Sequence, residues 1–151
     1  MEMSSIEFIV RPGLESDRVE AVVPVIDGTD LITLVTAFEH ARSFDVVGGY
    51  DGIIPANYRF GPLLDHFLGS DQSAWPGGGK IAVLGCACGE VGCWPIFTSV
   101  TATPARIRWE DFEQPYRADR DYRAFGPFDF DRNEYERAVA DAVAVLPPAP
   151  N

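Results

Sequence analysis

The first part of the chain contains two apolar segments with the spacing of β-strands. Ile6, Phe8 and Val10 stand at every second position, and the pattern ends at an Arg-Pro-Gly sequence typical of a turn. The next apolar run, 19–26, is rich in β-branched residues but contains Pro24, which has no N–H to donate to a neighbouring strand. We therefore predict two strands here, the second of them near an edge of its sheet.

Three further segments have the spacing of helices. Apolar residues three and four positions apart predict a helix over 30–42, and a shorter apolar run between Pro62 and Gly69 predicts a second helix. The third segment begins at Asp131, which precedes a glutamate by three residues in the spacing of a capping box, and its apolar stripe ends at Leu146. These patterns predict a short helix between two longer ones.

Three β-rich runs, 80–88, 95–103 and 105–109, follow one another closely and predict an antiparallel meander. Residues 110–137 mix acidic residues, arginines and aromatic residues, so we expect irregular structure that covers the sheet before the last helix begins. The whole pattern predicts an α+β fold: an antiparallel sheet of about five strands with helices packed on one face and an irregular, aromatic-rich C-terminal segment.

Length and composition favour one folded unit. A chain of 151 residues has the usual size of a single domain, and 46% hydrophobic residues suffice for a core. We expect one α+β domain over 1–146 and a flexible tail over 147–151. No apolar run approaches the roughly 18 residues of a membrane-spanning helix, and the N-terminus has no secretory signal, so we expect a cytoplasmic protein without a membrane partner.

The charge of the chain narrows the choice of partners. Acidic and basic residues number 23 and 12, which gives a net charge of −11 at pH 7. Such a chain repels phosphate, so we expect no nucleic-acid partner. The same charge attracts a basic protein partner, although it also serves solubility. Because the sequence holds no complete catalytic constellation, we favour a non-catalytic domain of the immunity or regulatory type that binds a protein or a small ligand.

Three cysteines provide the sharpest chemical signal. Cys86 and Cys88 lie at the end of the predicted strand 80–88, and Cys93 lies shortly before the predicted strand 95–103. Their odd number does not favour a disulfide framework. If the intervening Gly-Glu-Val-Gly forms the loop of a hairpin, Cys88 lies opposite Cys93 and all three sulfur atoms project from one face of the sheet. The same register places Leu84 opposite Phe97.

Three interpretations of these cysteines remain open. In the first, the sulfur atoms are small hydrophobes buried beneath an aromatic cover. In the second, the three thiolates bind zinc, with a fourth ligand from His40, His66, Glu90 or water, although Cys-x-Cys-x4-Cys lacks the paired Cys-x2-Cys of common zinc modules. In the third, Cys88 and Cys93 cycle between dithiol and disulfide. Metal binding or thiol redox chemistry is therefore the alternative to a simple binding domain.

A cluster of arginines and tyrosines follows the meander. The side chains of this run suit a planar or acidic ligand, and they belong to Tyr116, Arg117, Arg120, Tyr122, Arg123 and Phe125. Asp119 and Asp121 alternate with them, so we expect ion pairing within the segment instead.

The stretch around the cysteines resembles a set of short bacterial proteins of unassigned function. The run 84–95, Leu-Gly-Cys-Ala-Cys-Gly-Glu-Val-Gly-Cys-Trp-Pro, together with 109–115 and 128–131, is similar to their Cys-Gly-Cys-Gly-Glu-type hairpin and its surroundings. The resemblance covers about residues 20–140. Ala87 stands where we expect glycine, so a small residue is retained. The resemblance implies a single domain of the same design and no particular activity.

Overall fold

The computed structural model describes residues 3–70 and 75–147, and within them the chain forms three α-helices, eight strands and one short 3-10 turn. In chain order these are β1 (Ile6–Pro12), β2 (Glu20–Ile26), β3 (Thr29–Asp30), α1 (Leu31–Ala41), β4 (Tyr50–Asp51), α2 (Leu63–Leu68), β5 (Lys80–Cys86), η1 (Val91–Cys93), β6 (Ile96–Ala102), β7 (Arg106–Glu113), β8 (Phe128–Asp131) and α3 (Arg132–Val145). The predicted α+β class is confirmed.

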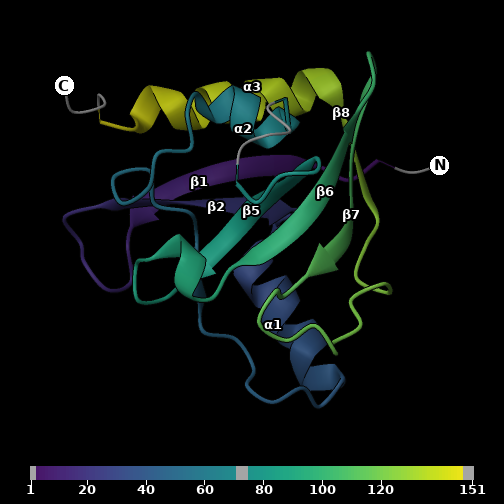
Figure 1. Cartoon of the computed structure of the whole chain (residues 1–151). Helices are drawn as coiled ribbons and strands as arrows, with labels where there is room; N and C mark the ends of the chain where they lie inside the picture. Colours follow the sequence, from purple (N-terminus) through teal and green to yellow (C-terminus); the bar gives the residue numbers. More distant parts are fainter. Residues whose placement is uncertain (1–2, 71–74, 148–151) are drawn as a thin grey trace.

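The strands form two antiparallel sheets that curl around a common core. One sheet has the order β1-β2-β3, and the other has the order β4-β5-β6-β7-β8. A bridge between Val22 and Ile53 joins them on one side. On the other side, the Ser4 N–H donates to the carbonyl of Asp129, 2.7 Å away. In Figure 1, α2 and α3 lie together above β1, while α1 lies at the opposite end of the molecule.

The helices begin where the sequence predicts. Asp30 caps α1 by accepting the Thr33 N–H at 2.9 Å, and Asp131 caps α3 by accepting the Glu134 N–H at 3.0 Å. The Glu134 carboxylate also accepts the N–H of Ile6 at 2.9 Å, which ties the first turn of α3 to β1. α2 ends at Gly69, whose left-handed conformation (φ 63°) suits a residue without a side chain.

An aromatic cluster fills the space between the sheets and α3. Trp109 and Tyr135 are fully buried, and the Trp109 Nε1–H donates to the Tyr135 hydroxyl oxygen at 3.0 Å. The Tyr135 hydroxyl in turn donates to the carbonyl of Phe67, so both buried polar groups have partners. Burial raises the pKa of Tyr135 far above its usual value. Phe8 of β1 packs edge-on against Tyr135, which brings the first strand and the last helix into one core.

Three details of the sequence prediction need correction or stay open. β2 is the central strand of its sheet, not an edge strand, and it accommodates Pro24 because that position lies beyond the short pairing with β3. The segment 110–137 is more regular than expected, since β7 continues to Glu113 and β8 precedes α3. The predicted tail lies outside the described residues from position 148 onward. None of the helices in the described part has the length and apolar surface needed to cross a membrane.

Candidate thiol site

The three cysteines lie in the turn that connects β5 with β6. Cys86 is the last residue of β5, Cys88 follows it in the turn, and Cys93 ends η1. Figure 1 shows this turn beyond the arrowhead of β5. The predicted register is wrong: Leu84 pairs with Ile96, not with Phe97, and the ladder contains an irregularity just before that pair. Cys88 and Cys93 therefore approach each other through the turn and not as directly paired strand residues.

The turn departs from a simple hairpin for steric and hydrogen-bonding reasons. Val91 is 7% exposed because it folds back over the strand, and a Cβ atom on Gly85 would lie 3.0 Å from the Val91 Cα. Glycine at position 85 therefore permits the close approach. Pro95 has no N–H to extend the ladder toward Cys93, so regular pairing starts only at Ile96.

The turn nevertheless brings the three sulfur atoms together. The Sγ atoms of Cys86, Cys88 and Cys93 all lie within 4.8 Å of one another, and none of the three forms a disulfide. Cys88 and Cys93 are exposed, and Cys86 is half-buried. The interpretation of the cysteines as buried hydrophobes is therefore wrong.

Three phenylalanines near β7 and β8 that could form an aromatic cover pack on one another and not on the cysteines. Phe112 meets Phe125 at a centroid distance of 4.8 Å, and Phe128 packs edge-on against both rings. Their apolar surface is thus used within the core around β7 and β8, and the thiols stay open to solvent.

The environment distinguishes the thiols from one another. The backbone N–H of Glu90 and a hydrogen bond from the Cys86 thiol lower the pKa of Cys88 below its usual value. Burial raises the pKa of Cys86 to about 11, and the N–H of Cys88 approaches its sulfur at 3.4 Å. Cys88 therefore loses its proton more readily than Cys86, and its neighbours stabilise the resulting charge.

Hydrogen bonds from distant segments hold the turn in place. The Ala87 N–H donates to the Gly49 carbonyl at 2.9 Å, and the Asn57 side-chain amide donates to the Gly89 carbonyl at 2.9 Å. On the far side of the turn, the Tyr116 hydroxyl donates to the Gly92 carbonyl at 2.5 Å. These bonds come from three separate parts of the chain, so the position of the sulfur atoms does not depend on the turn alone.

Trp94, directly after Cys93, connects the turn to the loop before β4. Its Nε1–H donates to the Gly48 carbonyl at 3.0 Å, and its ring stacks on Tyr50 at a centroid distance of 6.4 Å. The guanidinium groups of Arg117 and Arg120 lie over the same ring, 5.0 and 5.8 Å from its centroid. The side chains of Arg117 and Arg120 thus pack on the tryptophan ring next to Cys93.

A buried carboxylate anchors the loop that supports the turn. Glu39 of α1 is 0% exposed and accepts the Gly48 N–H at 2.8 Å. Its other oxygen accepts the hydroxyls of Tyr50 and Tyr122, each at 2.6 Å, and pairs with Arg120 at 3.1 Å. Burial and the neighbouring carboxylate raise the pKa of Tyr122 to about 12. These contacts join α1, the loop before β4 and the segment after β7.

Sequence reasoning missed Glu39, although its position carries a signal. Leu31 and Val35 are buried on the inner face of α1, and Glu39 continues the same series with four-residue spacing. A carboxylate at such a position needs several donors nearby. The predicted ion pairing within the arginine segment is confirmed for Arg123 with Asp121 (2.9 Å), but Arg120 reaches Glu39 instead.

The candidate fourth ligands do not join the cysteine group. Among the described residues, a metal-ligating cluster is formed by the three cysteines without His40, His66 or Glu90. His66 is half-buried, and its Nε2 lies 2.9 Å from the Ala82 carbonyl oxygen. Burial lowers its pKa.

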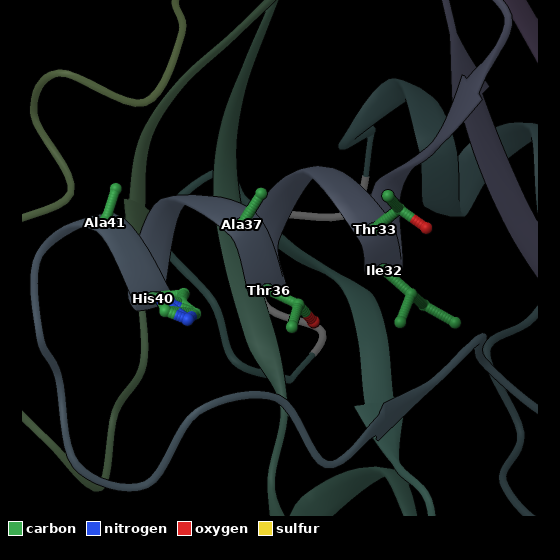
Figure 2. Close-up of a pocket in the computed structure, with 6 residues that line it drawn as sticks. All are labelled: Ile32, Thr33, Thr36, Ala37, His40 and Ala41. Carbon is green, nitrogen blue, oxygen red and sulfur yellow. The ribbon is translucent and has the colours of Figure 1, made fainter.

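His40 lies on a different surface. It projects from α1 on the same side as Thr36 and Ile32 and lines a shallow hollow of about 630 Å³ formed by one face of the helix (Figure 2). His40 is exposed, and the hollow contains no cysteine or carboxylate.

The site thus consists of three convergent thiols, two of them exposed, on a turn fixed by surrounding hydrogen bonds. Thiolates in this arrangement are able to bind a soft or borderline metal ion or to exchange with disulfides. No family model matches the sequence, and neither a curated protein nor a solved structure matches the chain.

Proposed function

We propose that this protein binds a thiophilic divalent cation, zinc, through Cys86, Cys88 and Cys93. The observation that carries the proposal is the convergence of the three Sγ atoms within 4.8 Å of one another. Three thiolates also supply the soft sulfur donors that zinc prefers among common protein ligands.

The distances suit a metal ion with little rearrangement. Zinc–sulfur bonds of about 2.3 Å in a tetrahedral site place the sulfur atoms roughly 3.8 Å apart. Starting from separations of at most 4.8 Å, each pair needs to close by about 1 Å or less. Side-chain rotation supplies a change of this size, so the backbone of the turn can stay where its hydrogen bonds hold it.

The fourth coordination position falls to water or to an external ligand. Cys88 and Cys93 are exposed, so solvent has access to the metal from their side. Three thiolates and one exchangeable ligand form an open site, in contrast to the closed four-ligand sites of structural zinc modules. We therefore expect exchangeable binding, as in a protein that carries or senses a metal.

The experiment is a zinc titration of the reduced protein against a chromophoric chelator, with native mass spectrometry for stoichiometry. The wild type should bind one zinc ion per chain, and binding should weaken as the pH falls because the metal displaces protons from thiols. Cys86→Ser, Cys88→Ser and Cys93→Ser should each weaken binding by about 100-fold or more, since loss of a direct ligand exceeds the usual 10- to 100-fold effect of an outer partner.

Three matched variants serve as controls. His40→Gln, His66→Gln and Glu90→Gln remove the other candidate ligands and should leave zinc affinity within about threefold of the wild type, which is smaller than the loss of even an outer partner. Failure of the wild type to bind, or equal losses in the cysteine and control variants, would contradict the proposal. A mass deficit of two hydrogens that appears in air, together with no zinc uptake by the reduced chain, would favour disulfide cycling and overturn it as well.

A further inference from the structure

The thiol site offers three donors of its own and no fourth. The Sγ atoms of Cys86, Cys88 and Cys93 lie within 4.8 Å of one another, and no histidine or carboxylate of the described residues joins the group. A zinc ion therefore completes its tetrahedral shell with water or an external ligand. An element that forms three bonds to sulfur and needs no fourth ligand uses the same donors without such help.

Trivalent arsenic has this coordination. Its three bonds form a pyramid, and a lone pair of electrons occupies the fourth direction. Cys88 and Cys93 are exposed, so the lone pair has room on the solvent side while the three bonds point to the sulfur atoms. Arsenic is also a soft centre, and thiolates are soft donors. The number, type and exposure of the donors thus suit this metalloid.

The charge balance distinguishes arsenic from zinc. A zinc ion with three thiolates carries one net negative charge, and this charge would lie beside Glu90 in a protein whose net charge is −11. A complex of three thiolates with trivalent arsenic is neutral, and arsenous acid itself is uncharged at neutral pH. The acidic protein therefore repels neither the incoming ligand nor the complex.

We propose that Cys86, Cys88 and Cys93 bind trivalent arsenic, which the protein takes up as arsenous acid. Three S–H bonds and three As–O bonds break, three As–S bonds form, and three water molecules leave. Arsenic stays trivalent and no sulfur is oxidised, so the step needs neither an oxidant nor a reductant. The inference rests on the same three-thiol site as the zinc proposal, but it does not require the protein to bind zinc.

The folded turn prepares the site for this ligand. Binding draws the sulfur atoms together from separations of at most 4.8 Å, a change that side-chain rotation supplies. The Asn57 side-chain amide holds the Gly89 carbonyl in place. The Tyr116 hydroxyl holds the Gly92 carbonyl in the same way. Because the turn is already ordered, binding costs little conformational freedom, and the three thiols should bind more tightly than thiols held far apart.

The experiment adds arsenous acid to zinc-free protein that has been reduced with a phosphine, because thiol reductants compete for arsenic. Sulfur-to-arsenic charge-transfer absorption follows binding, and mass spectrometry of the intact chain identifies the product. The wild type should gain one arsenic atom and lose three hydrogens. Cys86→Ser, Cys88→Ser and Cys93→Ser each leave two thiols and should weaken binding by about 100-fold or more, beyond the effect of losing an outer partner.

A matched variant keeps three cysteines but moves one of them. Cys93→Ser combined with Ala144→Cys places the third thiol at an exposed position of α3. In Figure 1, α3 lies beyond β1 and well away from the turn that follows β5. The relocated thiol does not reach the other two, so this variant should bind arsenic as weakly as Cys93→Ser alone.

The outcomes decide between the alternatives. Uptake of one arsenic atom with loss of three hydrogens, weakened alike in the single and the relocated variants, supports the proposal. No uptake by the wild type, a product with only two As–S bonds, or wild-type affinity in the relocated variant overturns it. A zinc titration of the same preparation separates the two proposals. Zinc uptake without arsenic uptake overturns only this inference, whereas arsenic uptake without zinc uptake overturns only the zinc proposal.

Discussion

Glu39→Gln is the most informative single substitution for the architecture around the thiol site. The carboxylate of Glu39 accepts hydrogen bonds from Gly48, Tyr50 and Tyr122 and pairs with Arg120. Glutamine has nearly the same shape but carries no charge, and its amide nitrogen presents hydrogens to groups that are themselves donors. The change therefore keeps the volume of the side chain and removes its negative charge.

The expected loss follows from the burial of both charges. The side chains of Glu39 and Arg120 are 0% and 3% exposed, so the variant leaves a guanidinium largely buried without its counter-charge. Removal of one partner of such a pair typically costs about 3–5 kcal/mol. Domains of this size have free energies of unfolding of about 5–15 kcal/mol, so the variant should fold but lose a large part of its stability.

Urea unfolding followed by tryptophan fluorescence measures this loss. Glu113→Gln is the matched control, because Glu113 pairs with Lys80 at 2.8 Å on a half-exposed surface, where an ion pair is worth roughly 1 kcal/mol or less. Adding Arg120→Met to Glu39→Gln should recover part of the loss, since the uncompensated charge is then gone. A loss below about 1 kcal/mol for Glu39→Gln, or one equal to that of the control, would refute the reasoning.

Three further substitutions test other parts of the structure. Because burial lowers the pKa of His66 from 6.5, the unfolded chain takes up this proton first as pH falls, and the free energy of unfolding should drop below about pH 6.5. In urea unfolding, His66→Gln should flatten this drop, whereas His40→Gln should not. Asp131→Ala should cost about 1 kcal/mol in thermal unfolding by removing the α3 cap; no change would contradict the cap. Tyr135→Phe leaves the buried Trp109 N–H without its acceptor and should cost about 1–3 kcal/mol; a neutral result in urea unfolding would argue against this bond.

The local elements were predictable because their signals lie within a few residues. The predicted helix over 30–42 corresponds to α1 at Leu31–Ala41, and the capping residue Asp131 begins α3 as expected. Alternation identified β1, and the meander of β5, β6 and β7 follows the order predicted. Each of these depends on side-chain spacing and capping, which the sequence carries directly.

The thiol site was predictable in membership but not in geometry. The sequence indicated that Cys86, Cys88 and Cys93 lie together, and the structure confirms their proximity. It did not indicate that Val91 folds back over Gly85, which lengthens the turn and shifts the register. Such a contact depends on the packing of the whole turn, whereas the hairpin rule considers only the number of loop residues.

The supporting contacts depend on segments far apart in the chain. Glu39 and Arg120 are separated by 81 positions, and neither residue has a local pattern that names its partner. The exposure of the cysteines has a similar origin, because the rings of Phe112 and Phe125 pack on each other instead of covering the sulfur atoms. Long-range packing choices of this kind have no local signature in a single sequence.

The most direct test of the zinc site is the zinc K-edge X-ray absorption spectrum of the reduced, zinc-loaded protein. It counts the sulfur atoms around the metal and measures their distances. The geometry of Cys86, Cys88 and Cys93 predicts three sulfur ligands at about 2.3 Å and one oxygen or nitrogen ligand. A first shell with two or fewer sulfur atoms, or with four shared between two chains, would contradict a three-thiolate site within a single chain.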